Sequence, residues 1–179
     1  MKTVVVREFE TQNLQGVPDV DLKEAYVLDL NTTPVADCIG CWTCWWKTPG
    51  RCIYKDLDEF FHNYVHADRA VFAAQVTRGF VSGKLKILFD RMIPLYLPYT
   101  DFSSGESMHV PRYGHYPKVE FYYQGEFDSE DGRHIFEDYI KRVFYQFYTE
   151  LVCVKPLNGS MDGSIEGAIE LSTEKGGAE

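Results

Sequence analysis

The chain has 179 residues, 45% of them hydrophobic, which is enough for one well-buried core and too few for two full domains. Its 27 acidic and 18 basic residues give a formal charge of −9, which argues against a broad basic surface for nucleic acid or anionic lipid. No apolar run approaches the roughly 18 residues that a membrane-spanning helix needs, and the one at the start is too short for a signal peptide. We therefore expect one cytoplasmic domain over residues 1–179, with small-molecule or protein partners, no nucleic acid and no membrane.

The first part of the chain predicts two strands and then a helix. The β-branched runs Met1–Val6 and Ala25–Leu30 are typical of strands, and the polar segment between them is either a loop or one poor helix. A cysteine-rich loop over residues 36–55 follows. Asp56 and Glu59 then have the spacing of a capping box, which predicts that a helix begins there.

The middle of the chain predicts a buried strand, a capped helix and a long insertion. Ala70–Val76 has the apolar pattern of the strand, and Ser82 can cap the helix that follows. Pro94 stops this helix and begins an aromatic insertion, residues 94–117, with little periodicity. Because compact domains rarely keep such a loop without a role, we expect it to cover a site or a partner subunit, with a plain surface excursion as the alternative.

The last part of the chain continues the alternation of strand and helix. Strands are expected at residues 119–123 and 151–154, on either side of a helix whose apolar face runs from Ile135 to Phe147. A segment from Ser164 to Leu171 is expected to close the fold. Since parallel strands need crossover connections that are usually helical, the whole pattern predicts an α/β fold around one parallel sheet.

The most specific pattern in the sequence is C-x2-C-x2-C-x7-C, formed by Cys38, Cys41, Cys44 and Cys52. The run follows the second predicted strand, so we expect it at the carboxyl edge of the sheet, where parallel sheets bind ligands. Disulfides seldom persist in a reducing compartment, and four thiolates suit zinc or an iron–sulfur cluster, with the two-residue spacings favouring the cluster. The alternative is a set of redox-idle thiols buried beneath neighbouring tryptophans. The fifth cysteine, Cys153, is expected to be a small core residue.

Two stretches of the chain resemble the flavodoxin-like NADPH-dependent FMN reductase family and its iron–sulfur flavoprotein relatives: ADCIGCWTCWWKTPGRCIYKDLDEF, from Ala36, and ADRAVFAAQVTRGFVSGKLKILFDR, from Ala67. The resemblance implies a flavodoxin-like three-layer sandwich, with a five-stranded parallel sheet of order 2-1-3-4-5. It also implies FMN and NAD(P)H as cofactors, an iron–sulfur centre on the four cysteines, and a homo-oligomer. The electron acceptor would be a small molecule or a redox protein.

The resemblance also implies which residues contact the flavin. In this family the loop after the third strand, and a second loop after the fourth, contact the flavin ring. The matching positions are Gln75, Val76, Thr77, Arg78, Gly79, Phe80, Gln124 and Gly125.

The first loop departs from the family pattern. Relatives follow their first strand with a Gly- and Ser-rich loop that binds the FMN phosphate, whereas this chain has Arg7-Glu8-Phe9-Glu10-Thr11-Gln12-Asn13. Two carboxylates there would repel a phosphate dianion, and only Arg7, Thr11 and Asn13 could offer side-chain donors. The leading hypothesis is therefore a flavin-dependent oxidoreductase. The alternative is a flavodoxin-fold protein without FMN that acts as a metal-bearing or protein-binding module.

Overall fold

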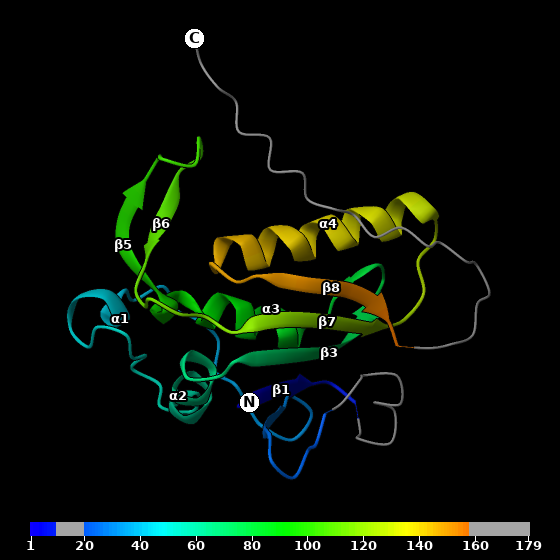
Figure 1. The fold of residues 1–179 in the computed structure, drawn as a ribbon, viewed down its shortest axis with the longest axis horizontal. Helices are drawn as coiled ribbons and strands as arrows, with labels where there is room; N and C mark the ends of the chain where they lie inside the picture. Colours follow the sequence, from blue (N-terminus) through cyan, green and yellow to red (C-terminus); the bar gives the residue numbers. More distant parts are fainter. Residues whose placement is uncertain (10–19, 158–179) are drawn as a thin grey trace.

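A computed structural model describes residues 1–9 and 20–157 (Figure 1). At its centre lies a parallel sheet in the order β2-β1-β3-β7-β8. These strands are β1 (Thr3–Arg7), β2 (Tyr26–Asp29), β3 (Arg69–Thr77), β7 (Lys118–Gln124) and β8 (Leu151–Pro156). They coincide closely with the five apolar runs, and their order corresponds to the predicted 2-1-3-4-5. The predicted flavodoxin-like α/β fold is confirmed.

Three helices cover one face of the sheet: α2 (Asp58–Val65), α3 (Gly83–Arg91) and α4 (Glu130–Gln146). Their apolar stripes pack on alternate residues of the strands, since successive strand side chains point to opposite faces. Phe72 of β3, for example, stacks on Phe121 of β7 and meets Phe144 of α4 edge-on, with ring centroids 6.2 and 5.0 Å away. Burying such aromatic side chains stabilises the fold by about 2–3 kcal/mol each.

The opposite face of the sheet carries a smaller apolar cluster, which includes Val5, Val71 and Tyr122. Most of the polar segment between the first two strands, and the segment Ser164–Leu171, lie outside the described residues. Within the described part of the chain, no helix is long and apolar enough to cross a bilayer.

One of the two predicted helix caps is confirmed and one is wrong. The hydroxyl of Ser82 accepts a hydrogen bond from the Leu85 N–H at 3.1 Å and caps α3. The capping box of Asp56 and Glu59 does not form, because α2 begins at Asp58 and the Asp56 carboxylate is bound elsewhere, by the Ala36 N–H and an arginine.

The aromatic insertion, residues 94–117, is not irregular as its lack of periodicity suggested. After the short 3-10 helix η2 (Ile93–Leu95) it forms an antiparallel hairpin of β5 (Tyr96–Asp101) and β6 (Met108–Pro111). The register shifts between Tyr96 and Thr100, around Pro98, which can donate no ladder hydrogen bond. This break hides the strand period in the sequence. The hairpin projects from one end of the sheet beside the short helix α1 (Thr43–Trp46) (Figure 1).

Replacing Ser82 tests the cap of α3. Ser82→Ala removes the hydrogen bond to the Leu85 N–H and also the bond that the hydroxyl donates to the Glu8 carboxylate, so the free energy of unfolding should fall by at least about 1–2 kcal/mol. Urea denaturation at neutral pH measures the change. Ser107→Ala, at an exposed position with no hydrogen bond among the described residues, is the control and should change stability by less than about 0.5 kcal/mol. Equal effects of the two substitutions would contradict the capping role.

Candidate cofactor sites

The residues expected to contact a flavin come together at the carboxyl ends of β3 and β7. Gln75 and Gln124 are direct partners in the parallel register, and the Gln75 side-chain amide donates to the Gln124 carbonyl at 2.9 Å. Gly125 has φ of 146° and packs directly on Val76, where an added Cβ would lie 2.7 Å from the valine carbonyl oxygen. Only glycine allows this approach, which holds the two loops together.

The loop after β3 is a tight hairpin. Arg78 and Gly79 have φ of 53° and 73°, and they connect β3 to the short antiparallel strand β4 (Phe80–Val81). Two positive φ values at the central positions of a two-residue hairpin are typical of a type I′ turn. The turn leaves the Arg78 side chain exposed, and it forms no ion pair within residues 1–9 and 20–157. The exposed Phe80 packs against Tyr139 of α4, with ring centroids 4.5 Å apart and the ring planes tilted by 43°.

A buried carboxylate lies beside these loops. Glu8, at the end of β1, is 8% exposed and accepts hydrogen bonds from the Gln75 N–H at 2.9 Å and from the Ser82 hydroxyl. Burial raises its pKa, although both hydrogen bonds and nearby Lys84 act in the opposite direction. Glu8 therefore links the ends of β1 and β3 to the start of α3.

The described part of the first loop supplies little for a phosphate. Arg7 pairs with Asp29 at 2.8 Å, and the Glu8 carboxylate occupies donors that an anion would otherwise use. Thr11 and Asn13 lie outside the described residues. The residues at the family's ring-contact positions thus lie together at one edge of the sheet, whereas the described part of the first loop leaves few donors free for a phosphate.

The cysteine loop is closed by an ion pair with a buried arginine. Arg91, at the end of α3, is 2% exposed and binds both carboxylate oxygens of Asp56, at 2.6 and 3.1 Å. It also donates to the Ala36 carbonyl at 2.5 Å, while the Ala36 N–H donates to Asp56 at 2.9 Å. These bonds tie Ala36, at the start of the loop, and Asp56, directly after its end, to each other and to α3. The hydrogen bonds with Arg91 and Ala36 outweigh the effect of burial and lower the pKa of Asp56.

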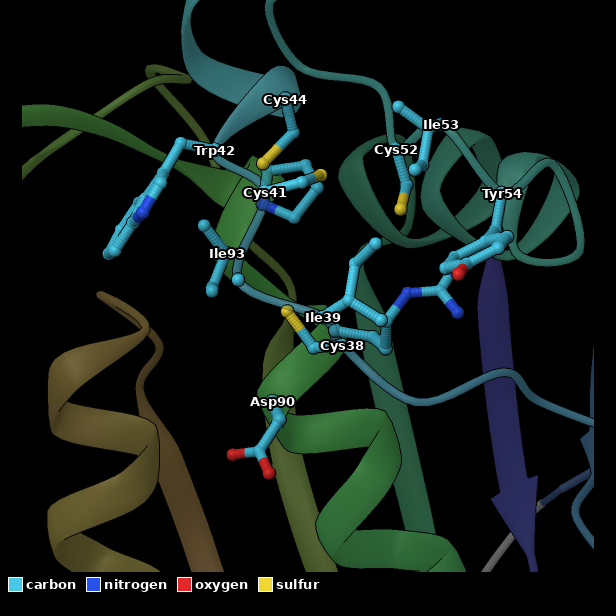
Figure 2. Close-up of a pocket in the computed structure, with 13 residues that line it drawn as sticks. Cys38, Ile39, Cys41, Trp42, Cys44, Cys52, Ile53, Tyr54, Asp90 and Ile93 are labelled. Carbon is cyan, nitrogen blue, oxygen red and sulfur yellow. The ribbon is translucent and has the colours of Figure 1, made fainter.

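All four predicted ligands, Cys38, Cys41, Cys44 and Cys52, line one pocket as free thiols (Figure 2). Burial, and then the charges of the other three thiols, raise the pKa of Cys44 to about 11. A hydrogen bond from Thr43 lowers the pKa of exposed Cys41. Four thiolates this close repel one another unless a cation lies between them. The donor set therefore fits a positively charged metal centre.

The sulfurs share a pocket without converging on one point. Among the described residues, no three His, Cys, Asp or Glu side chains are placed to ligate a single ion. Four thiolates are the donor set of both a mononuclear zinc site and an iron–sulfur cluster, and the four cysteines of this loop supply that set.

The cysteine pocket does not lie at the carboxyl edge of the sheet, as its position after the second strand suggested. Its walls include Asp90, Arg91 and Ile93, at the carboxyl end of α3, whereas the strand ends gather around Ser82 at the amino end of that helix. The two candidate sites are therefore separated by the length of α3, about 13 Å. The order of elements along the chain predicts that the long loop begins at the carboxyl end of β2. It does not predict at which end of the sheet the cysteines of that loop will lie.

The tryptophans do not bury the thiols. Trp42 and Trp46 are 53% and 65% exposed. Trp45 packs against the insertion instead: its indole N–H donates to the Tyr96 carbonyl at 3.1 Å, and its ring lies 5.0 Å from that of His109. The fifth cysteine, Cys153, is half-buried in β8 and lies outside the pocket.

Sequence reasoning missed Arg91, Asp56 and the buried state of Glu8. A signal for Arg91 was present, since it follows Leu88 by three residues and therefore falls on the buried face of α3. A charged residue on an apolar helix face requires a partner. Nothing in the sequence identified Asp56 as that partner, because its capping-box spacing offered a local explanation.

The sheet order and the helices define a protein of the flavodoxin-like α/β class. Solved structures agree: an azoreductase from Bacillus anthracis str. Sterne aligns with a TM-score of 0.52 at 10% identity, over 87% of this chain and 85% of that one. A flavone reductase aligns with a TM-score of 0.54 at 12% identity, over 87% of this chain and 53% of that one. At these identities the likeness shows the fold alone.

At the sequence level, the chain is similar to an iron–sulfur flavoprotein of Methanocaldococcus jannaschii. The two are 32% identical over 98 residues, which cover 54% of this chain and 47% of that protein, so the match spans about half of the relative's length. No protein-family model matches the chain. The sequence match confirms the resemblance to the iron–sulfur flavoprotein relatives, and the solved structures confirm the flavodoxin-like fold that the resemblance implied.

Glu8→Gln tests the buried carboxylate. The folded-state pKa of Glu8 lies above its ordinary value of 4.5, so the native protein binds more protons than the unfolded chain between these two values. The contribution of Glu8 to stability should therefore fall as pH rises through that window. We expect E8Q to gain stability relative to wild type as pH increases, measured by urea denaturation from pH 4 to 7.

Glu106→Gln is the matched control. Its pairing with Arg142 lowers the pKa of Glu106, so the native protein binds fewer protons there and the sign reverses. E106Q should lose stability relative to wild type as pH rises. A flat difference between E8Q and wild type over this range would show that Glu8 is not held in a charge-disfavouring site.

Proposed function

We propose that this chain is a flavin-dependent oxidoreductase of the NAD(P)H-dependent FMN reductase type, with an iron–sulfur cluster on Cys38, Cys41, Cys44 and Cys52. The observation that carries the proposal is the single pocket lined by four free thiols in a C-x2-C-x2-C-x7-C run. The sequence similarity to an iron–sulfur flavoprotein supports it independently. The proposal includes one domain over residues 1–179 and a cytoplasmic location.

The flavin ring would be held by the two loops after β3 and β7, at Gln75 to Phe80, Gln124 and Gly125. In this arrangement the rigid turn at Arg78 and Gly79 and the close approach of Gly125 to Val76 fix the shape of the edge. The exposed Arg78 supplies a positive charge that can face the phosphate or the N1 region of the ring. When bound, the flavin supplies hydride and electron transfer, and the protein supplies position and electrostatics.

The cysteine loop would hold the cluster through its backbone conformation. Gly40 and Trp42, on either side of Cys41, have φ of 63° and 59°. Such left-handed residues turn the chain sharply and direct successive thiols toward one space. Trp45 fixes the loop on the insertion through its bond to the Tyr96 carbonyl. The insertion would thus support the cluster loop rather than act as a detached excursion.

The electron acceptor would be a small molecule or a redox protein that reaches the cysteine pocket. Cys38 and Cys41 are exposed, as are the neighbouring apolar side chains of Ile39 and Trp42. Exposed apolar residues around a site are typical of contact surfaces. A homo-oligomer is part of the same proposal, because such a surface could equally meet a second copy of the chain.

A second candidate function is a flavodoxin-fold, metal-bearing module without FMN. Glu8 favours it, because its carboxylate binds the Gln75 N–H and the Ser82 hydroxyl at the edge where the flavin would bind. The optical spectrum of anaerobically purified protein, with flavin, iron and zinc analysis of the same sample, separates the two functions. Flavin bands with broad brown absorbance support the first. Brown protein that takes up no FMN supports the second.

Substitution of one cysteine tests the cluster. Cys44→Ser should abolish the broad absorbance and the bound iron while the protein stays folded, since loop ligands are not part of the core. Cys153→Ser, outside the pocket, is the matched control and should keep both. Colourless wild-type protein with about one zinc per chain, or anaerobic protein with less than a few tenths of an iron per chain, would refute the cluster.

Arg78→Ala tests the flavin edge. Removing an exposed charge that contacts bound FMN should weaken FMN binding about five- to tenfold, which corresponds to about 1–1.4 kcal/mol. The measurement is a titration of flavin-free protein followed by flavin fluorescence. Arg51→Ala, at an exposed arginine in the cysteine loop, should leave the affinity unchanged. Unchanged affinity in R78A would remove Arg78 from the site without bearing on the cysteines.

A further inference from the structure

One nitrogen of Arg91 has no partner. Its two terminal nitrogens bind the Asp56 carboxylate and the Ala36 carbonyl, at 2.5 to 3.1 Å. The Nε–H, in contrast, is buried and has no hydrogen-bond acceptor in the described part of the chain. Buried N–H groups are nearly always satisfied, so a donor left over beside a candidate site indicates a missing acceptor.

The environment of Arg91 indicates which acceptor is missing. Arg91 and Cys52 line the same pocket, and the Cys52 thiol lies close enough to the guanidinium to interact with it through charge and hydrogen bonding. The Tyr54 ring centroid lies 5.2 Å from the guanidinium carbon, and among the described residues Tyr54 forms no hydrogen bond with Arg91. Cys52 is thus the nearby group that can accept from the remaining N–H as a thiolate.

We propose that Arg91 is a positioning residue for Cys52, whose sulfur accepts a hydrogen bond from the Arg91 Nε–H when the thiolate is a cluster ligand. The cluster itself rests on the proposed function. Cys52 is separated from Cys44 by seven residues, so the short turns that place the other three cysteines cannot place it. Arg91 places it from α3, with the same guanidinium that closes the loop through Asp56 and Ala36.

The proposed hydrogen bond from Arg91 would give Cys52 an electrostatic environment that differs from that of the other three cysteine ligands. A hydrogen bond and a positive charge at a ligand sulfur stabilise the reduced, more negative form of a cluster and raise its reduction potential. Arg91 would therefore adjust the potential through Cys52, in addition to holding the loop. A purely structural arginine would leave the potential unchanged wherever the cluster remains bound.

The test compares Arg91→Lys with Asp56→Asn. R91K keeps the positive charge but loses the planar guanidinium, whose several N–H groups can reach Asp56 and Cys52 at the same time. D56N removes the carboxylate that binds Arg91 and leaves the Arg91 Nε–H in place. Anaerobic redox titration of the reconstituted proteins should give a more negative potential in R91K than in D56N or wild type. Equal potentials in R91K and D56N would overturn the proposal.

A second measurement needs no cluster. In metal-free protein, the charge and the hydrogen bond that Arg91 directs at the Cys52 sulfur should make Cys52 react with an alkylating reagent several-fold faster, relative to Cys41, in wild type than in R91K. Mass spectrometry of each modified peptide gives the rates, and circular dichroism confirms that the variants are folded. Arg91→Met serves as a second variant if R91K retains the contact.

The two readouts separate the two proposals. If wild-type protein takes up no iron but Cys52 loses its relative reactivity in the Arg91 variants, the cluster proposal fails and the contact stands. If the cluster forms while the potential and the Cys52 reactivity match those of D56N, the cluster stands and the contact is refuted.

Discussion

The ion pair between buried Arg91 and the more exposed Asp56 holds the cysteine loop in place on α3. Removing Asp56 would leave the buried charge of Arg91 without its carboxylate partner, which is strongly unfavourable. The other end of α3 is fixed by Ser82, whose hydroxyl accepts from Leu85 and donates to Glu8. A single nine-residue helix therefore carries the cysteine pocket at one end and the proposed flavin edge at the other.

The sequence determined the fold because each strand is a separate β-branched or aromatic run and the connecting helices repeat at helical spacing. Ser82 was predictable as a cap for the same reason: its role depends on residues three positions away. The capping box at Asp56 failed because a carboxylate forms whichever bond is stronger, and a buried arginine brought by another element outcompetes a local N–H. The insertion was missed because Pro98 and the register shift interrupt the strand period.

In the candidate sites, too, local features could be predicted from the sequence and contacts between distant residues could not. Gln75 and Gln124 could be brought together from the sequence alone, because neighbouring parallel strands end at one edge. The spacing of the cysteines predicted a shared pocket, which only needs short turns. The position of that pocket could not be predicted, since a loop from residue 30 to 57 can reach either end of the sheet. Its position is set by the contacts of Arg91 with Ala36 and Asp56. No pattern in the neighbouring sequence indicates which distant residues form such contacts.

The separation of the two sites by the length of α3 affects how partners would use the protein. If electrons enter at the flavin edge and leave at the cysteine pocket, the donor and the acceptor do not compete for one surface. Both can be bound at the same time, and neither has to leave before the other arrives. Turnover would then follow a ternary-complex scheme with intersecting steady-state lines, rather than the parallel lines of a reductase whose two substrates take turns at one face of its flavin.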